Sequence, residues 1–128
     1  AEFYLDVLAA ESAEATATVI ARLFSPALPK NELLWFASEI VKLPRRHAAD
    51  LLYNHCSLDW RDVIKTIRLP SLVVGAEASI FSAESQRWIA AQIPGAAVEI
   101  FAAGEGGSHF MCYENPVKFN ALVEAFLA

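Results

Sequence analysis

The sequence is poor in the features that mark several large classes of protein. Its two cysteines, Cys56 and Cys112, show no C-x-x-C spacing, so we expect a reduced, cytoplasmic protein, with a disulfide possible but unsupported. No apolar run approaches the roughly 20 residues of a membrane-spanning helix, so we expect no membrane partner. No basic region followed by an apolar block opens the chain, and we expect no intact signal peptide.

Charge and metal-ligating residues are equally sparse. The net charge is −5, and the short "PRRH" at 44–47 indicates only the solvated start of a helix, so we expect no nucleic-acid partner. His55 beside Cys56 offers two zinc ligands where a site needs three or four, and we expect no metal and no cofactor. The chain begins with Ala1 in place of an initiator Met, which favours a processed, tagged or excised product.

Hydrophobic residues, by contrast, are abundant. They make up 55% of the chain, above the usual figure of about 45–50%. This suffices for a hydrophobic core with a surplus. The surplus indicates a large apolar pocket, an oligomer, or a surface that contacts further chain.

The apolar pattern of residues 1–68 is helical throughout. Residues Leu33, Phe36 and Ile40 lie on one stripe, and Asn31 is the N-cap that we expect for that helix. Similar stripes precede and follow this segment, and three prolines separate them. No alternation typical of a strand occurs before residue 69.

The second half of the chain changes character. "LPSLVVGAE" is a short apolar run that ends in Gly75, which is typical of a strand buried on both faces. A helix capped by Ser82 follows, and "PGAAVEIF" then predicts a second strand. The last helix is expected to begin with Asn115 as its cap and Pro116 at its first position.

The order strand, helix, strand, helix predicts two parallel strands joined by a right-handed crossover. In such sheets, reactive side chains gather where the strands end. Loops 75–82 and 102–110 both lie at that edge. His109 lies in the second loop, within "GGSHF", and could also be an ordinary structural histidine.

Several of these segments resemble a known family. "IRLPSLVVGAE", "WIAAQIPGA" and "GGSHFMCYENPVKFNALVEAFL" are similar to the C-terminal third of an α/β-hydrolase, in the esterase and cofactor-free haloperoxidase-like branch. "DWRDVIKTIRLPSL" resembles the segment that leaves the helical cap. The resemblance is strong over 59–128 and rests on helical content over 1–58. It implies an α/β fold, with 1–68 a helical cap-like segment and 69–128 the C-terminal strand–helix–strand–helix part of the core.

The resemblance also implies roles for individual residues. His109 matches the triad histidine. The triad acid is expected near position 78, where this chain has Ala78, and the adjacent Glu77 is the stand-in that we predict. Glu105 is better interpreted as a solvated loop charge. Position 82, often Pro in the family, is Ser82 here.

The aromatic residues of the first half have two possible roles. Trp35, Phe36 and Tyr53 would line an acyl pocket if the cap closes over the site. They could equally be core residues between the cap helices.

The nucleophile of the family is not found in this chain. The family's serine lies in a G-x-S-x-G elbow, and no serine here has glycine two residues before and two residues after it. Ser79 and Ser108 have no such context. The resemblance therefore implies a histidine prepared to activate a serine that lies outside these residues.

Two classes of function follow. The first is the cap and C-terminal portion of a serine hydrolase that acts on a small-molecule ester or related acyl bond, with His109 as general base and then general acid. The second is a non-catalytic, truncated unit. In both cases we expect a homodimer or a complementary N-terminal chain, because a strand near 71–75 would lack a neighbour on one side.

Overall fold

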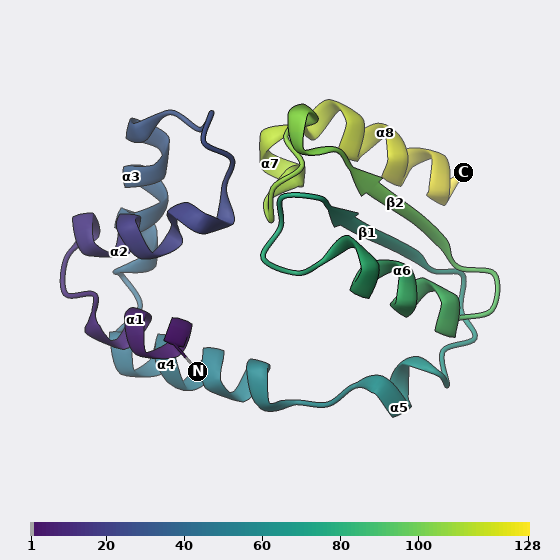
Figure 1. Cartoon of the computed structure of the whole chain (residues 1–128), viewed down its shortest axis with the longest axis horizontal. Helices are drawn as coiled ribbons and strands as arrows, with labels where there is room; N and C mark the ends of the chain where they lie inside the picture. Colours follow the sequence, from purple (N-terminus) through teal and green to yellow (C-terminus); the bar gives the residue numbers. More distant parts are fainter. Residues whose placement is uncertain (1) are drawn as a thin grey trace. The chain divides into compact units, whose positions relative to one another are not determined.

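The protein, for which we describe a computed structural model, is made of helices and one small sheet, and the structure describes residues 2–128 (Figure 1). Every described element before residue 69 is helical, as the sequence predicts. No helix within the described range is both long enough and apolar enough to cross a membrane. In chain order the elements are α1 (Glu2–Ala9), α2 (Ala13–Ile20), the 3₁₀ helix η1 (Ala21–Leu23), α3 (Lys30–Ile40), α4 (Arg45–Ser57), α5 (Arg61–Ile64), β1 (Leu72–Ala76), α6 (Ala83–Gln92), β2 (Ala97–Phe101), the 3₁₀ helix η2 (Ala103–Glu105), α7 (Met111–Glu114) and α8 (Pro116–Leu127).

The chain divides into two compact units. The first consists of Ala1–Arg22 and Pro26–Asp59, and the second of Leu23–Ser25 and Trp60–Ala128. From the sequence we expect a boundary between residues 68 and 69, where the helical cap-like segment ends and the first strand segment begins. By packing, α5 and the short segment Leu23–Ser25 both belong with the sheet.

Paired helices form the first unit, with α1 packed on α4 and α2 on α3. Its buried residues include Ala17, Ala37 and Ala49, whose small side chains let the helices approach closely. Our prediction of Asn31 as an N-cap is wrong. The carbonyl of Pro29 accepts the first helical hydrogen bonds, so α3 begins at Lys30 and Asn31 lies in its first turn.

The second unit contains the parallel strand pair that the sequence predicts. β1 and β2 pair in register from Leu72 opposite Ala97 to Ala76 opposite Phe101. The helix between them, α6, makes the crossover and packs on both strands. Ser82 caps α6 by accepting a hydrogen bond from the backbone N–H of Ser85, which confirms the predicted cap.

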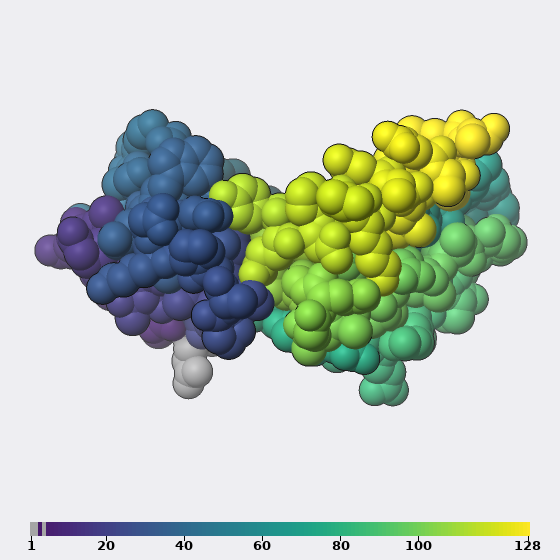
Figure 2. Space-filling view, turned by 90° about the horizontal axis from the view of Figure 1, so that it is seen from above, coloured from purple at the N-terminus to yellow at the C-terminus, as the bar shows by residue number. Residues whose placement is uncertain are grey.

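The two faces of the sheet are covered by different helices (Figure 1). On the α6 face, a Cβ atom at Gly75 would lie 2.6 Å from Cγ of Gln86, so the close approach of α6 requires glycine there. On the other face, α8 forms an outer layer (yellow in Figure 2). The core on that side consists of Ala76, Phe101 and Met111, with Val74, Phe119 and Leu122 packed against it.

Lys118 of α8 ties this face together. Its Nζ lies 2.8 Å from Oε1 of Glu99 on β2 and 2.6 Å from Oε1 of Glu105 in η2. The same ammonium lies 4.4 Å from the centre of the Phe101 ring, which is fully buried. Asn115 caps α8 by accepting from the N–H of Lys118, as predicted. These contacts hold α8 and the loop after β2 against the end of the sheet.

Candidate functional site

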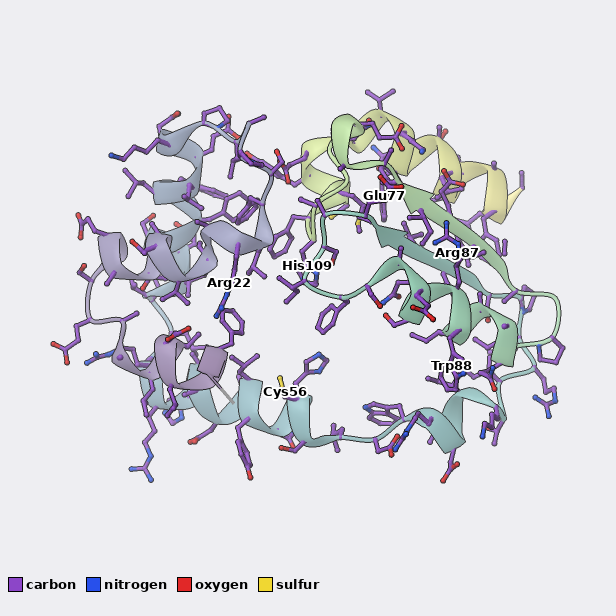
Figure 3. All side chains as sticks on the ribbon, in the orientation of Figure 1. Arg22, Cys56, Glu77, Arg87, Trp88 and His109 are labelled. Atoms are coloured by element: carbon purple, nitrogen blue, oxygen red, sulfur yellow. The ribbon has the colours of Figure 1, made fainter. Side chains whose placement is uncertain are left out.

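His109 lies in the loop between β2 and α7, at the carboxyl end of the sheet (Figure 3). The loop turns sharply because Gly106 has a left-handed φ of 79° and Gly107 passes very close to earlier backbone. A Cβ atom at Gly107 would lie 2.3 Å from the carbonyl oxygen of Ala102. The backbone N–H of His109 donates to the carbonyl of Leu23 at 3.1 Å. A backbone hydrogen bond therefore holds the loop at His109, and the turn before it has no room for a side chain at position 107.

Hydrogen bonds join the loop after β1 to the loop after β2. The N–H of Glu77 donates to the carbonyl of Phe101 at 3.0 Å, and the N–H of Ala78 donates to the carbonyl of Gly107 at 2.9 Å. Parallel pairing brings these two loops to the same edge, as the sequence predicts. The two positions that the family resemblance connects, near 78 and at 109, therefore lie on adjoining loops.

Glu77 lies at this edge but its carboxylate has another partner. The side chain is exposed, and Oε2 accepts a hydrogen bond from the backbone N–H of Ala103 at 3.0 Å. Within residues 2–128 no hydrogen bond joins it to His109. Figure 3 labels both residues in their separate loops. The role of Glu77 as triad acid stays a prediction.

The imidazole of His109 is half-buried and has one side-chain hydrogen-bond partner among the described residues. Oγ of Ser79 lies 3.2 Å from Nδ1 of His109. The rings of Phe81 and Phe110 meet the imidazole edge to face, at 5.4 Å and 5.2 Å between centres. Burial among these groups lowers the pKa of His109 below its ordinary value, so the ring is neutral near pH 7. A neutral imidazole can accept a proton, as a general base must.

Glu114 of α7 anchors the histidine loop. Its carboxylate accepts hydrogen bonds from the hydroxyls of Ser25 and Ser108, and from the N–H of Ser25 at 3.1 Å. Oγ of Ser108 in turn accepts from the N–H of Phe110 at 3.1 Å. Ser108 is fully buried, its hydroxyl donates a hydrogen bond to Glu114, and its oxygen accepts from the backbone next to His109, so it holds that backbone in place. The structure thus gives Ser108 a supporting role.

A hollow of about 200 Å³ opens beside the imidazole. Apart from His109 itself, it is lined by Val74, Gly75, Ser79, Phe81, Gln86 and Met111. Val74, Gly75, Phe81 and Met111 form its apolar lining, and Ser79, Gln86 and His109 contribute the polar atoms. The hollow lies entirely within the second unit.

The three predicted pocket aromatics belong to the first unit. Trp35 and Phe36 lie on α3, where their rings meet edge to face at 5.0 Å, and Tyr53 lies on α4. Trp35 is 54% exposed and Tyr53 is 63% exposed, so neither is a core residue of that unit. Their role in an acyl pocket stays a prediction.

Possible metal-ligating side chains do not cluster in this structure. Among the side chains that the structure describes, no three of His, Cys, Asp or Glu gather in a group that could hold an ion. Cys56 and Cys112 are both exposed thiols.

Reasoning from the sequence missed three residues of this site. Ser79 follows the expected acid position by one residue, and a polar side chain there was the only available signal. Ser25 and Glu114 are 89 residues apart in the chain, and no pattern connects them. The contact between them exists only because Leu23–Ser25 packs with the second unit.

Comparison with solved structures finds proteins of similar fold, whereas two other comparisons find no match. No family model matches the chain, and no curated protein matches it. Among solved structures, the chain is similar to Est816, an N-acyl homoserine lactone degrading enzyme, with a TM-score of 0.66 and 20% sequence identity. The match covers 96% of this chain and 50% of the other, so the chain spans about half the length of that structure. At this identity the likeness shows a shared, hydrolase-like fold.

Proposed function

We propose that this chain is the cap and C-terminal portion of a serine hydrolase of the α/β-hydrolase type, and that it supplies the histidine base, His109. The observation that carries the proposal is the position of His109. It lies at the carboxyl end of a parallel strand pair, with its Nδ1 held by the neighbouring loop and a small hollow beside it. This arrangement suits a base that acts through its other nitrogen, Nε2.

The chemistry follows from the state of the imidazole. Neutral His109 would take the proton of a serine hydroxyl through Nε2 as the serine oxygen attacks the carbonyl carbon of an ester. The imidazolium would then give that proton to the leaving alcohol oxygen, and the acyl group would remain on the serine. In the second half, His109 would take a proton from water as the water oxygen attacks the acyl carbon, and the imidazolium would then give that proton to the serine oxygen as the acid leaves.

The substrate class that we propose is a small ester or a related acyl bond. The resemblance to esterases supports it, and so does the fold likeness to an enzyme that degrades N-acyl homoserine lactones. A lactone is a cyclic ester, so its hydrolysis uses the same sequence of proton transfers. The hollow beside His109, at about 200 Å³, has room for a small group of the substrate.

The 128 residues contain no G-x-S-x-G elbow, and we infer that they lack the nucleophile of this mechanism. We therefore expect this chain by itself to show little or no turnover of a chromogenic acetate ester or of an N-acyl homoserine lactone. Robust turnover that a serine-directed inhibitor abolishes would contradict the proposal, because it would require a serine of this chain to attack.

The direct test uses the gene sequence upstream of residue 1. If it encodes a G-x-S-x-G elbow, the complete enzyme should hydrolyse such esters, and His109→Ala should lower kcat by about four orders of magnitude or more. His47→Ala is the matched control, because His47 is an exposed residue of α4 and should leave kcat unchanged. A normal kcat in His109→Ala would reassign this histidine to a structural role.

A second candidate function is a non-catalytic unit that associates with itself or with a complementary chain. The sheet favours it, because β1 and β2 form the only sheet of the described residues, and each strand has one unpaired edge. A two-stranded sheet is marginal by itself. We propose a hydrophobic interface of obligate size, above about 2,000 Å² in total. Sedimentation of a stable monomer at micromolar concentration would contradict this candidate.

A further inference from the structure

The nitrogen of His109 that a triad acid would hold already has a partner. In a Ser-His-Asp triad the acid accepts a hydrogen bond from Nδ1–H, which keeps the proton off Nε2 and orients the ring. Here Oγ of Ser79 lies 3.2 Å from Nδ1 of His109, while residue 78 is Ala. The carboxylate of Glu77 accepts from the N–H of Ala103. A hydroxyl thus stands where a carboxylate would be expected.

The loop after β1 holds Ser79 in this place. The N–H of Ser79 donates to the carbonyl of Ala76 at 3.3 Å, and the preceding residue, Ala78, donates to Gly107 in the histidine loop at 2.9 Å. The N–H of Phe81 donates to Oγ of Ser79 at 3.2 Å. The hydroxyl is therefore fixed from its own loop before it meets the imidazole.

From this geometry we propose that Ser79 is a positioning residue of His109, taking the place of the triad acid; the proposal rests on the hydrolase function proposed above. A serine oxygen can accept two hydrogen bonds and donate one. Phe81 uses one acceptor position, and the second can accept from Nδ1–H. The proton is then held on Nδ1, and Nε2 keeps the lone pair that a base needs.

The hydroxyl orients the ring but brings no negative charge. The carboxylates on the surrounding elements accept hydrogen bonds from other donors. Glu77 accepts from the N–H of Ala103, Glu105 from the N–H of Ala102 and the ammonium of Lys118, and Glu114 from the hydroxyls of Ser25 and Ser108. Burial alone acts on the pKa of His109, and it lowers that pKa. A carboxylate at position 79 would add the charge that favours the imidazolium.

The test compares Ser79→Asp with Ser79→Asn in this chain, because the two side chains match in size and differ in charge. The probe is the imidazole of His109, followed by ¹⁵N and ¹³C NMR through a pH titration. With Asp, we expect a single Nδ1–H tautomer and a titration midpoint shifted to higher pH. With Asn, we expect the midpoint to stay near that of the wild-type chain. An identical midpoint and tautomer in both variants would overturn the proposal.

Two controls complete the test. Ser79→Thr keeps the hydroxyl and should preserve the wild-type tautomer ratio, whereas Ser85→Ala removes an exposed hydroxyl of α6 that donates to Ser82 and should change nothing at His109. Labelling of Ser79 by a fluorophosphonate would also overturn the proposal, because Ser79 would then act as nucleophile. The NMR readout is independent of turnover, so failure of the ester assays and failure of this proposal are separate results.

Discussion

Replacing Gly107 by alanine should damage the histidine loop far more than the same change at Gly104. The new Cβ at 107 would lie 2.3 Å from the carbonyl oxygen of Ala102 and 2.6 Å from that of Phe101. Both are backbone atoms, so no side chain can rotate away. Overpacking costs about 1–3 kcal/mol, and displacement of the loop also weakens the hydrogen bond from Ala78 to Gly107, worth about 0.5–1.5 kcal/mol.

We therefore expect Gly107→Ala to lower the free energy of unfolding by about 1.5–4.5 kcal/mol. At Gly104 nothing lies within 4 Å of the added Cβ, and alanine there reduces the entropy of the unfolded chain. Gly104→Ala should therefore be neutral or stabilise by up to about 1 kcal/mol. Both glycines lie between β2 and α7, which makes the pair a matched comparison.

Urea denaturation followed by circular dichroism measures the difference. With an m-value of about 1–3 kcal/mol per molar urea, typical of small proteins, the urea midpoint should fall by about 0.5 M or more in Gly107→Ala. The NMR resonances of His109 should also move in Gly107→Ala and stay in place in Gly104→Ala. Equal midpoints for the two variants would refute the close approach of Gly107 to Ala102 on which the loop geometry rests.

Three further outcomes are expected. Burial lowers the folded-state pKa of His109, so below about pH 6.5 the unfolded chain binds more protons than the folded chain, and the free energy of unfolding should fall as the pH drops. Urea midpoints should show that His109→Gln loses less stability than the wild-type chain between about pH 7.5 and pH 5. Phe101→Ala should lower the free energy of unfolding by about 3–5 kcal/mol, because the Phe101 side chain is fully buried. Val98 lies on the same strand and is 41% exposed, so Val98→Ala should lower it far less in the same urea assay. Lys118→Met should raise the pKa of the Glu105 carboxyl, since the hydrogen bond from Lys118 is the main cause of its lowered pKa; a carboxyl titration by NMR that matches the wild-type chain would contradict this contact.

Local features of the second half were predictable from the sequence because their physics is local. The short apolar runs that predict the strands, and the caps at Ser82 and Asn115, each depend on residues within a few positions of one another. A strand, helix, strand order has one favoured handedness, and it brings the loops that contain Glu77 and His109 to one edge. The place of His109 at that edge therefore followed from the sequence.

Only the tertiary structure decided which partners the side chains of this edge take. The loop after β1 directs the carboxylate of Glu77 to the backbone N–H of Ala103 and places the hydroxyl of Ser79 beside His109. The contact of Glu114 with Ser25 spans 89 residues and depends on how Leu23–Ser25 packs. Such contacts depend on loop geometry and long-range packing, for which periodicity and capping carry no signal. The sequence by itself thus determined where His109 would lie, and tertiary packing determined which groups contact it.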